Sequence, residues 1–460
     1  MLRLLRLASV AAVVAVVAAP AQAAVPQDLR LVNYYPAHAG WTYMWERWDP
    51  AAIDADIARI AALHANSVRL IAQVPAFGWP EGGALYRARL EQAVSLAAAH
   101  GLRVELTLFD WFDGYDDVAG SELWAASVLA PYANDPRLAA VELQNELDAA
   151  NPAAVAWART LLPVVRRLAG AIPVTISVGG RDPIEGIRTL RRALAPQSLP
   201  DFWSFHYYDK AELSLGVLAA ARDAAAPQPL FVGETGYWDG ASDPPVATEA
   251  EREDEQVRYF RTVEAAARRL ALPTVAPWAL SDFAPDGVPV AMKSPEYHFG
   301  LYRVDGSPKP AAAAVRRLFA GAQDRGGFNR GFEDALPGDR TRLASWHGPG
   351  SRDARVAHTG RASATIAAGG RLWTIPTTPW VTPGARLAAT AWARGAGARI
   401  SVLFFDATRA LVGRADSASG AGTATWTRLR AAAVVPPTAA YVRLELSTAS
   451  RAWFDDVTLG

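Results

Sequence analysis

Two glutamates stand where short apolar runs end, and their type and spacing suit catalysis. Glu146 follows the run 140–144 with Asn145 between them, and Glu234 directly follows the run 230–233. Two carboxyl groups on opposite sides of one cavity could cleave a glycosidic bond. One would be held protonated to donate to the leaving oxygen, and the other would be ionised to attack or stabilise the cationic carbon. Taken singly, each glutamate could equally be a solvated residue at the end of a strand.

The elements that must position these glutamates form a repeating pattern. Eight short apolar segments, rich in Val, Leu, Ile and Phe as buried parallel strands are, alternate with helical stretches between Leu29 and about Ala322. The expected strands are 29–35, 66–72, 103–109, 139–144, 173–178, 201–207, 230–233 and 274–280. Eight such units in fewer than 300 residues predict a (β/α)8 TIM barrel, an α/β fold. An open doubly wound sheet is the alternative, but Asn33-Tyr34-Tyr35-Pro36 is no Gly-rich phosphate turn.

In an eight-stranded barrel the two glutamates would end the fourth and the seventh strand. They are 88 residues apart, which is about three units of ~30 residues and matches strands four and seven. Active sites of such barrels lie at the carboxyl ends of the strands, so both side chains are expected at the mouth. Three helix starts support the element boundaries: Asp49-Pro50, Asn151-Pro152, and the capping box of Thr248 with Glu251.

Composition narrows the possible partners and chemistries. The chain has 46 basic and 46 acidic residues, so no net charge gathers nucleic acid or an anionic membrane, and a neutral partner is favoured. The absence of cysteine excludes disulfides, thiolate metal sites and cysteine nucleophiles. No His-x-His pair ends a strand, so a metal-dependent barrel hydrolase would lack its ligands, and we expect no catalytic cofactor or metal.

The first 23 residues are expected to be a signal peptide. Arg3 and Arg6 precede an apolar run from Leu7 to Ala19, and Ala21-Gln22-Ala23 is a small-residue cleavage site. A membrane anchor is the alternative, but the run is shorter than the ~20 residues that span a bilayer. We therefore expect a secreted protein, extracellular or periplasmic, with no membrane span after signal removal.

A second domain is expected after the barrel. The barrel is assigned residues 24–324, and the polar, Gly-rich segment 323–327 is interpreted as a linker. From 325 to 460 the pattern changes to short alternating strands without helices, which predicts an all-β, jelly-roll-like sandwich. The expected strands are 372–375, 385–393, 399–405, 423–433, 441–447 and 452–459.

Several motifs together resemble one enzyme family. The strand ends Asn145-Glu146 and Gly233-Glu234 look like those of clan A glycoside hydrolases, closest to family 5, the cellulase-like barrels. Further matching positions are Asn66-Ser67-Val68-Arg69, Ser204-Phe205-His206-Tyr207-Tyr208, Pro277-Trp278, and 299–303 followed by 305–310. The resemblance covers the whole barrel.

The resemblance implies a role for each matched residue. Glu146 would be the acid/base and Glu234 the nucleophile of a retaining, double-displacement hydrolase, with Asn145 holding the sugar 2-hydroxyl. Arg69 and Tyr208 would keep the nucleophile ionised, His206 would contact the acid/base or substrate, and Trp278 would form a sugar platform. A structural ion pair is the alternative for Arg69.

The third strand departs from the family pattern. It ends in Asp110-Trp111, where many relatives have a histidine, so the resemblance does not name the sugar. Aromatic residues at the mouth, including Tyr35 and Trp111, are expected to stack on sugar faces. The expected substrate is a poly- or oligosaccharide with an O-glycosidic, β bond, and the expected enzyme is a monomer. A non-catalytic carbohydrate-binding protein on a decayed barrel and a transglycosylase are the alternatives.

The two ends of the second domain carry a resemblance of their own. The segments Phe328–Glu333 and Trp453–Val457 resemble carbohydrate-binding β-sandwich modules, which often hold a structural calcium near these ends. A plain stabilising sandwich without sugar affinity is the alternative, because such folds serve many roles.

Overall fold

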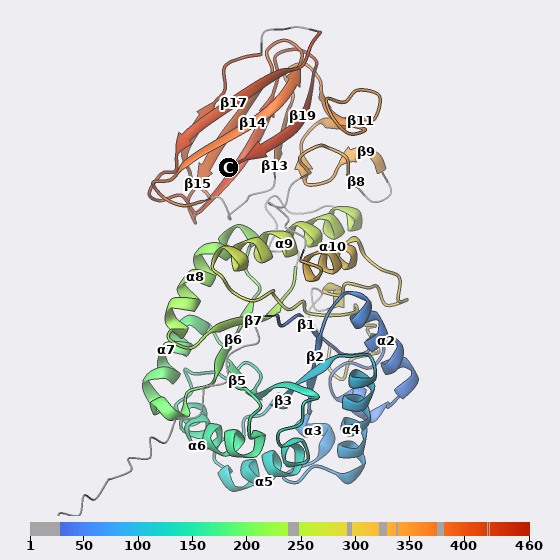
Figure 1. The fold of residues 1–460 in the computed structure, drawn as a ribbon, viewed down its shortest axis with the longest axis vertical. Coiled ribbons are helices and arrows are strands. Elements are labelled where there is room, and N and C mark those ends of the chain that lie inside the picture. Colours follow the sequence, from blue (N-terminus) through green and yellow to red (C-terminus); the bar gives the residue numbers. More distant parts are fainter. Residues whose placement is uncertain are drawn as a thin grey trace, which may run out of the picture.

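A parallel sheet rolled into a barrel forms the N-terminal part of the chain (Figure 1). The computed structural model describes residues 28–237, 248–291, 297–321, 329–336, 339–374, 381–420, 422 and 424–460. The sheet runs in sequence order through seven strands: β1 (Leu31–Asn33), β2 (Ser67–Ile71), β3 (Arg103–Phe109), β4 (Leu138–Gln144), β5 (Val174–Ser177), β6 (Phe202–Tyr207) and β7 (Leu230–Thr235). Nearly every strand residue is buried, which explains the continuous apolar runs.

The segment 274–280, expected as the eighth strand, closes the barrel without being a regular strand. The Ala276 N–H donates to the Val232 carbonyl of β7 at 2.9 Å, and the Asn33 N–H of β1 donates to the Pro277 carbonyl at 3.1 Å. Pro277 has no N–H to offer a ladder and β1 is only three residues long, so the pairing is sparse. The predicted strand is corrected to an irregular segment in the same place.

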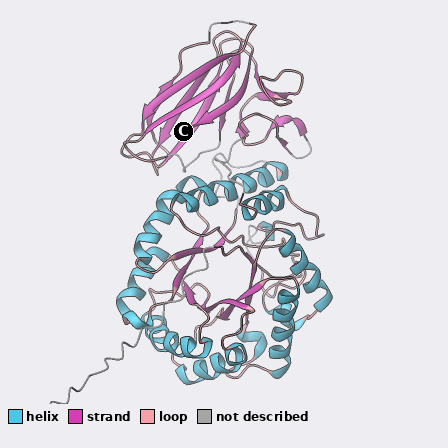
Figure 2. Cartoon of the chain, in the orientation of Figure 1, coloured by secondary structure: helices cyan, strands magenta, loops and turns pink. Residues whose placement is uncertain are grey.

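Helices surround the barrel (Figure 2). The longer ones are α2 (Pro50–Ala62), α4 (Ala84–Ala99), α5 (Val118–Leu129), α6 (Pro152–Ala169), α7 (Pro183–Ala193), α8 (Ser214–Ala225), α9 (Glu249–Arg269) and α10 (Pro310–Phe319). The three predicted helix starts are confirmed: the Asp49, Asn151 and Thr248 side chains each accept from first-turn N–H groups, and Glu251 completes the capping box. Among the described residues, none of the helices combines the length and apolarity needed to cross a bilayer.

The C-terminal part is a sandwich of two antiparallel sheets around one core. One sheet has the order β10-β13-β18-β15-β16 and the other β11-β12-β19-β14-β17, with the small pair β8-β9 beside them. The strands are β8 (Ala335–Leu336), β9 (Asp339–Leu343), β10 (Trp346–His347), β11 (Gly350–Asp353), β12 (Ser363–Ile366), β13 (Arg371–Thr374), β14 (Arg386–Arg394), β15 (Arg399–Phe405), β16 (Leu411–Asp416), β17 (Thr427–Val434), β18 (Tyr441–Ser447) and β19 (Ala452–Leu459). The sequence patterns missed β8 to β12 and β16, which are short or largely solvent-facing.

Helix α9 carries the contact between the two parts. The Ser345 N–H donates to the Asp254 carboxylate at 2.6 Å, Arg342 pairs with Glu251, and His347 lies 3.6 Å from Glu255. The predicted fold class, a TIM barrel followed by a β-sandwich, is confirmed. The signal peptide, the linker and the 324/325 boundary lie outside the described residues.

Candidate active site

Glu234, the expected nucleophile, lies at the end of β7 with little exposure. Its Oε2 accepts a 2.7 Å hydrogen bond from the Tyr208 hydroxyl, and its Oε1 accepts from the Arg69 guanidinium. Arg69 comes from β2 and Tyr208 follows β6, so three strands converge on one carboxylate. Two donors, one of them cationic, stabilise the ionised form of this group.

Arg69 is fully enclosed in the barrel, where further acidic side chains hold it. Its Nε and Nη2 contact Glu142 Oε2 at 3.0 and 2.5 Å, and its Nε lies 3.6 Å from Glu105 Oε1. Burial first, and then the charge of Glu142, raise the pKa of Glu105 to about 8. The two carboxylates in direct contact with the guanidinium are those of Glu142 and Glu234. Arg69 is therefore both a structural ion pair, the stated alternative, and a donor to Glu234.

Glu146, the expected acid/base, sits on a tight turn just after β4. Its φ is +49°, and its N–H donates to Ser177 Oγ of β5 at 2.8 Å. Gly179, on the turn after β5, lies so close that a Cβ there would stand 2.8 Å from both the Cβ and the carbonyl oxygen of Glu146. The glycine lets the two turns touch, and the Glu146 side chain is left 47% exposed at the mouth.

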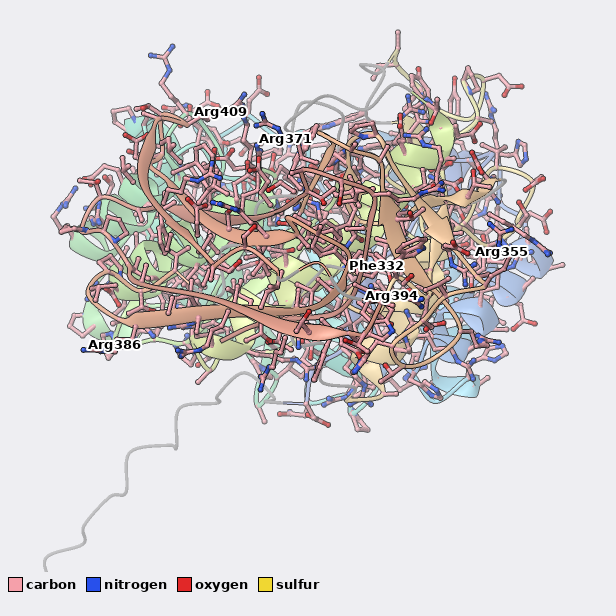
Figure 3. All side chains as sticks on the ribbon, turned by 90° about the horizontal axis from the view of Figure 1, so that it is seen from above. Phe332, Arg355, Arg371, Arg386, Arg394 and Arg409 are labelled. Carbon is pink, nitrogen blue, oxygen red and sulfur yellow. The ribbon has the colours of Figure 1, made fainter. Side chains whose placement is uncertain are left out.

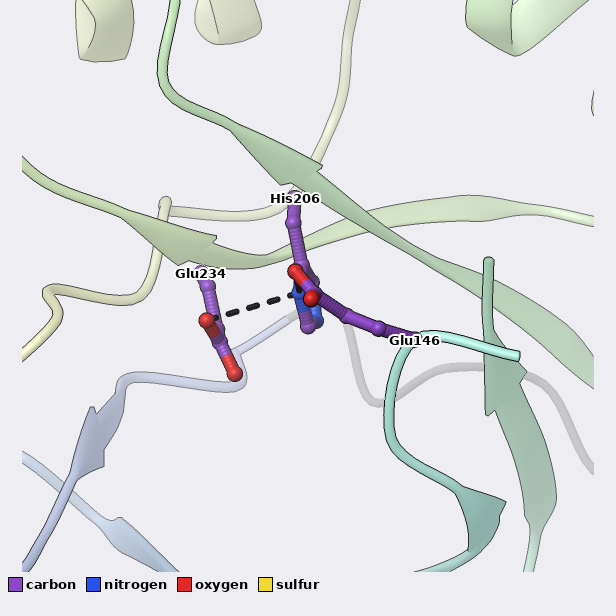
Figure 4. Close-up of side chains that lie close together, drawn as sticks. All are labelled: Glu146, His206 and Glu234. Atoms are coloured by element: carbon purple, nitrogen blue, oxygen red, sulfur yellow. Dashed lines mark hydrogen bonds and ion pairs between the residues drawn. The ribbon is translucent and has the colours of Figure 1, made fainter. Parts of the chain in front are cut away.

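His206 of β6 lies between the two glutamates (Figure 4). Its Nδ1 is 2.8 Å from Glu146 Oε1 and 3.4 Å from Glu234 Oε2. Burial would lower the pKa of His206, but the Glu234 charge and the bond to Glu146 raise it. Burial would likewise raise the pKa of Glu146, but the hydrogen bond and charge of His206 lower it. Both shifts favour the imidazole over the carboxylate as the holder of the shared proton.

One carboxylate oxygen of Glu146 and one of Glu234 lie within 4.8 Å of each other and of a His206 nitrogen. The same three ligand atoms could geometrically hold a metal ion. However, the Arg69 guanidinium and the Tyr208 hydroxyl already donate to Glu234, and a guanidinium in contact disfavours a cation there. The expectation of no catalytic metal stays a prediction.

A chain of amide and carboxyl groups supports Asn145. Asn145 Oδ1 accepts from Arg69 Nη2 at 2.8 Å, and its Nδ2 donates to Asp110 Oδ1 at 3.0 Å. The other Asp110 oxygen accepts from Gln73 Nε2 at 2.7 Å, and the same nitrogen contacts the Tyr35 hydroxyl at 2.7 Å. Burial raises the pKa of Asp110 against these donors. The sequence predicts Asp110 as a substrate-binding residue, and in the structure it orients Asn145.

An aromatic wall stands on the other side of the mouth. Trp41 stacks on Tyr35 at 5.2 Å and on Trp111 at 6.1 Å, and meets Trp278 edge-on at 6.0 Å. Trp111 is 46% exposed, whereas Tyr35 is completely buried beneath Trp41. Trp111 and the rim of Trp278 can face a sugar. Tyr35 supports the wall and cannot touch a ligand in this conformation, which corrects its predicted role.

A cavity of about 480 Å³ opens beside Glu146. It is bounded by the turn after β5, by α7, and by the end of β6, and it reaches His206, Tyr208 and Asp209. Because Glu146 forms one wall, a leaving group in this cavity would be within reach of its proton. The volume falls in the usual range of small-molecule sites.

The structure adds residues that motif reasoning did not find. Glu105 and Glu142 hold Arg69, and Ser177 fixes the Glu146 turn. The acidic pair did leave a signal, because each glutamate interrupts an otherwise apolar strand. A buried charge in such a strand needs a partner.

The second domain offers only some of the ligands that the expected calcium would need. Glu333 Oε1 accepts from the Arg361 N–H at 2.8 Å, and Asp455 Oδ2 accepts from the His358 and Thr359 N–H groups at 2.7 and 3.1 Å. Among the described residues, the sandwich brings no three acidic or histidine side chains together as the barrel mouth does. A cation here would need main-chain carbonyls as ligands, so calcium stays a prediction.

Comparison with known proteins bears on the barrel. No protein-family model and no curated protein matches the chain. Among solved structures, the exo-β-1,4-mannosidase Op5Man5 from Opitutaceae bacterium strain TAV5 matches 63% of this chain with a TM-score of 0.51 and 21% identity. The match spans only 58% of that mannosidase.

The barrel has the fold of these glycoside hydrolases. A GH5_18 protein from Bifidobacterium longum subsp. infantis aligns with 66% of this chain and 81% of its own, at 20% identity and a TM-score of 0.51. The GH5_18 E153A variant from Streptomyces cattleya, in complex with Manβ1-4GlcNAc, aligns with 68% of this chain and 83% of its own, at 19% identity and a TM-score of 0.53. At these sequence identities the similarity shows a shared fold and no more than that.

Proposed function

We propose that the barrel is a retaining glycoside hydrolase with Glu146 as acid/base and Glu234 as nucleophile. The observation that carries the proposal is the separation of the two carboxylates, which bring one oxygen each within 4.8 Å. Retaining enzymes hold their carboxyl groups about 5–5.5 Å apart, whereas inverting enzymes leave ~6.5–9.5 Å for a water molecule. One oxygen pair within 4.8 Å fits the retaining spacing better than the inverting one, which must accommodate a water molecule.

The surroundings give each glutamate its task. Glu234 attacks the anomeric carbon, and Arg69 and Tyr208 keep its oxygens ionised and aimed. Glu146 protonates the leaving oxygen with the proton that it shares with His206, and later takes a proton from the water that hydrolyses the glycosyl-enzyme. Asn145, held by Asp110 and Arg69, is placed to donate to the sugar hydroxyl next to the reacting carbon.

The stereochemistry of the first product tests the mechanism. Proton NMR of an aryl β-glycoside digest should show the β-anomer appearing first, with the α-anomer growing only by mutarotation. An α-anomer formed first would mean inversion and would remove Glu234 from the nucleophile role. No hydrolysis of any activated aryl glycoside would favour the carbohydrate-binding alternative.

The substrate proposal is a β-linked oligo- or polysaccharide. The similar structures include a β-1,4-mannosidase and a complex with Manβ1-4GlcNAc, so aryl β-mannosides are the first members of the panel to test. We further propose that the enzyme is exported, because residues 1–23 have the pattern of a signal peptide, and that it acts as a monomer. N-terminal sequencing of the protein recovered outside the producing cell should begin near Ala24.

A further inference from the structure

The formal charge of the chain is unevenly divided between its two parts. Residues 329–460 contain 16 arginines, no lysine and nine acidic residues, a formal charge of +7. The preceding residues, with 30 basic and 37 acidic, carry −7. The zero net charge of the whole chain therefore conceals a basic sandwich. The argument that zero net charge favours a neutral partner applies to neither part taken alone.

Part of this positive charge lies on one flat face of the sandwich. On β14, Leu387, Ala389, Ala391 and Ala393 point into the core, so the alternate residues point outward. Cross-strand pairing places Trp392 opposite Arg428 of β17, and Arg394 opposite Trp453 of β19. We call the outward set the arginine face: Arg386, Trp392, Arg394, Arg428, Arg430 and Trp453. Figure 3 shows Arg386 and Arg394 on one side of the sandwich and Arg371 and Arg409 on the other.

The guanidinium groups of the arginine face are not neutralised by nearby acids. Within the described residues, none of its four arginines forms a salt bridge, and the neighbouring acids have other partners, since Asp456 pairs with His358 and Asp353 binds Trp453 Nε1 and Arg355. The opposite sheet is different, because its Arg414 pairs with Asp416 at 2.7 Å and with Glu445 at 3.2 Å. Four cations without counter-charges are poised for an anionic ligand.

Aromatic rings lie among these cations. Trp392 stacks on His358 at 4.2 Å, and the Arg394 guanidinium lies 5.9 Å from the Trp453 ring centroid. Both tryptophans keep part of their surface exposed. The nine residues from Arg386 to Arg394 span eight intervals, which extend about 27 Å at ~3.4 Å per residue. The barrel contacts the sandwich through Arg342, Ser345, His347 and Thr382, and none of these residues belongs to the arginine face (Figure 1).

We propose that the arginine face binds an acidic polysaccharide, with the guanidinium groups pairing with its carboxylates and the tryptophans contacting the sugar rings. The choice of a polysaccharide over another polyanion rests on the proposed glycosidase function of the barrel. Binding there would hold the barrel near its substrate and raise the local concentration of glycosidic bonds.

The test uses the full chain in affinity electrophoresis and in equilibrium binding at fixed salt. The probes are polygalacturonate, its fully methyl-esterified form, alginate and double-stranded DNA. We expect retention by a polyuronate, at least tenfold weaker binding to the uncharged ester, and weaker binding to DNA. The double variant Arg428→Ala/Arg430→Ala should lose at least tenfold in affinity, whereas Arg371→Ala/Arg399→Ala, on the opposite sheet, should not.

Binding and catalysis are read separately. Hydrolysis of an aryl glycoside should be unchanged in the Arg428→Ala/Arg430→Ala variant, so failure of the binding proposal is distinct from failure of the glycosidase proposal. Binding to neither polyuronate, equal binding to the ester, DNA binding as tight as polyuronate binding, or equal losses on both faces would each overturn the proposal.

Discussion

Glu146 and Glu234 are the same chemical group, and what distinguishes them is the set of donors that each receives. Arg69 and Tyr208 both donate to Glu234, whereas within the described part of the chain His206 is the one side chain bonded to the Glu146 carboxylate, which opens to the cavity. Fixed donors hold the Glu234 carboxylate in one orientation. A single titratable partner, His206, allows Glu146 to gain and lose a proton during the reaction.

Substitution should separate these two roles. Glu234→Ala should abolish turnover of every glycoside, because no glycosyl-enzyme can form. Glu146→Ala should lose roughly 10²–10⁴-fold on substrates with poor leaving groups but still release dinitrophenolate, which needs no proton. Steady-state and burst kinetics on dinitrophenyl and natural glycosides measure this. Added azide should give products of opposite anomeric configuration in the two variants, and equal losses without azide products would contradict the assignment.

The basic limb of the pH profile should belong to Glu146 and His206 together. The pKa of His206 is raised above its ordinary 6.5, so the pair retains one proton to a higher pH than a carboxyl group alone would. Activity that needs this proton is lost as pH rises through that value. His206→Gln should move the basic limb of kcat/KM to lower pH by on the order of one unit.

The control for that profile is His100→Gln, which removes a surface histidine paired with Asp54 and should leave the limb in place. An unmoved limb in His206→Gln would show that His206 does not hold the catalytic proton.

At this scale the sequence indicated the residues at strand ends and missed those that support them. Glu146, Glu234 and Arg69 follow from strand-end position and motif. The support of Asn145 by Asp110, and the burial of Tyr35 under Trp41, depend on how loops far apart in sequence meet. No local pattern encodes such contacts.

At the scale of elements, the turn after β5 fixes the turn that carries Glu146. Gly179→Ala would place a Cβ 2.8 Å from the Glu146 backbone, so one turn must shift. We expect a loss of about 1–3 kcal/mol in unfolding free energy and a fall in kcat larger than any rise in KM. Thermal melting and steady-state kinetics check both.

Gly216→Ala is the matched control. A Cβ at Gly216, inside α8, meets nothing within 4 Å, so this change should leave activity intact and stabilise the protein by up to ~1 kcal/mol. Equal behaviour of the two alanine variants would show that the contact between the turns does not position Glu146.

The element pattern was predictable wherever a strand is long and buried on both faces. β3, β4 and β6 lie within a residue of their expected ranges. The segment 274–280 lies where the eighth strand was predicted, between β7 and β1, but it is not a regular strand. Its hydrogen bonding depends on the length and position of β1 and β7, which its own residues do not encode. In the sandwich, solvent-facing strands such as β16 carry too few apolar residues to be recognised.

At the scale of the whole molecule, the contact between the barrel and the sandwich should respond to pH. Burial first, and then the charge of Glu255, raise the pKa of Asp254 to about 7, while its ordinary value is 3.8. Stability from the protonated group is therefore fully present below about pH 4 and is lost as pH rises through about 7. Asp254→Asn keeps an acceptor for the Ser345 N–H and should remove this loss.

Melting curves from pH 4 to 8 test this expectation. The wild-type protein should become less stable relative to Asp254→Asn as pH rises, by ~1.4 kcal/mol for each unit of the pKa shift. The exposed Asp223→Asn serves as the control and should follow the wild type. Parallel curves for wild type and Asp254→Asn would mean that Asp254 is ionised in the folded protein at neutral pH.

The opposite charges of the two parts give the molecule a large electric dipole moment. Near a negatively charged wall or gel, the field exerts a torque that turns the sandwich toward the surface and the barrel away from it. The enzyme would then arrive already oriented, before any contact forms. This alignment reaches only about 8 Å in physiological salt, so binding to the surface should depend strongly on salt even though the charges of the two parts nearly cancel.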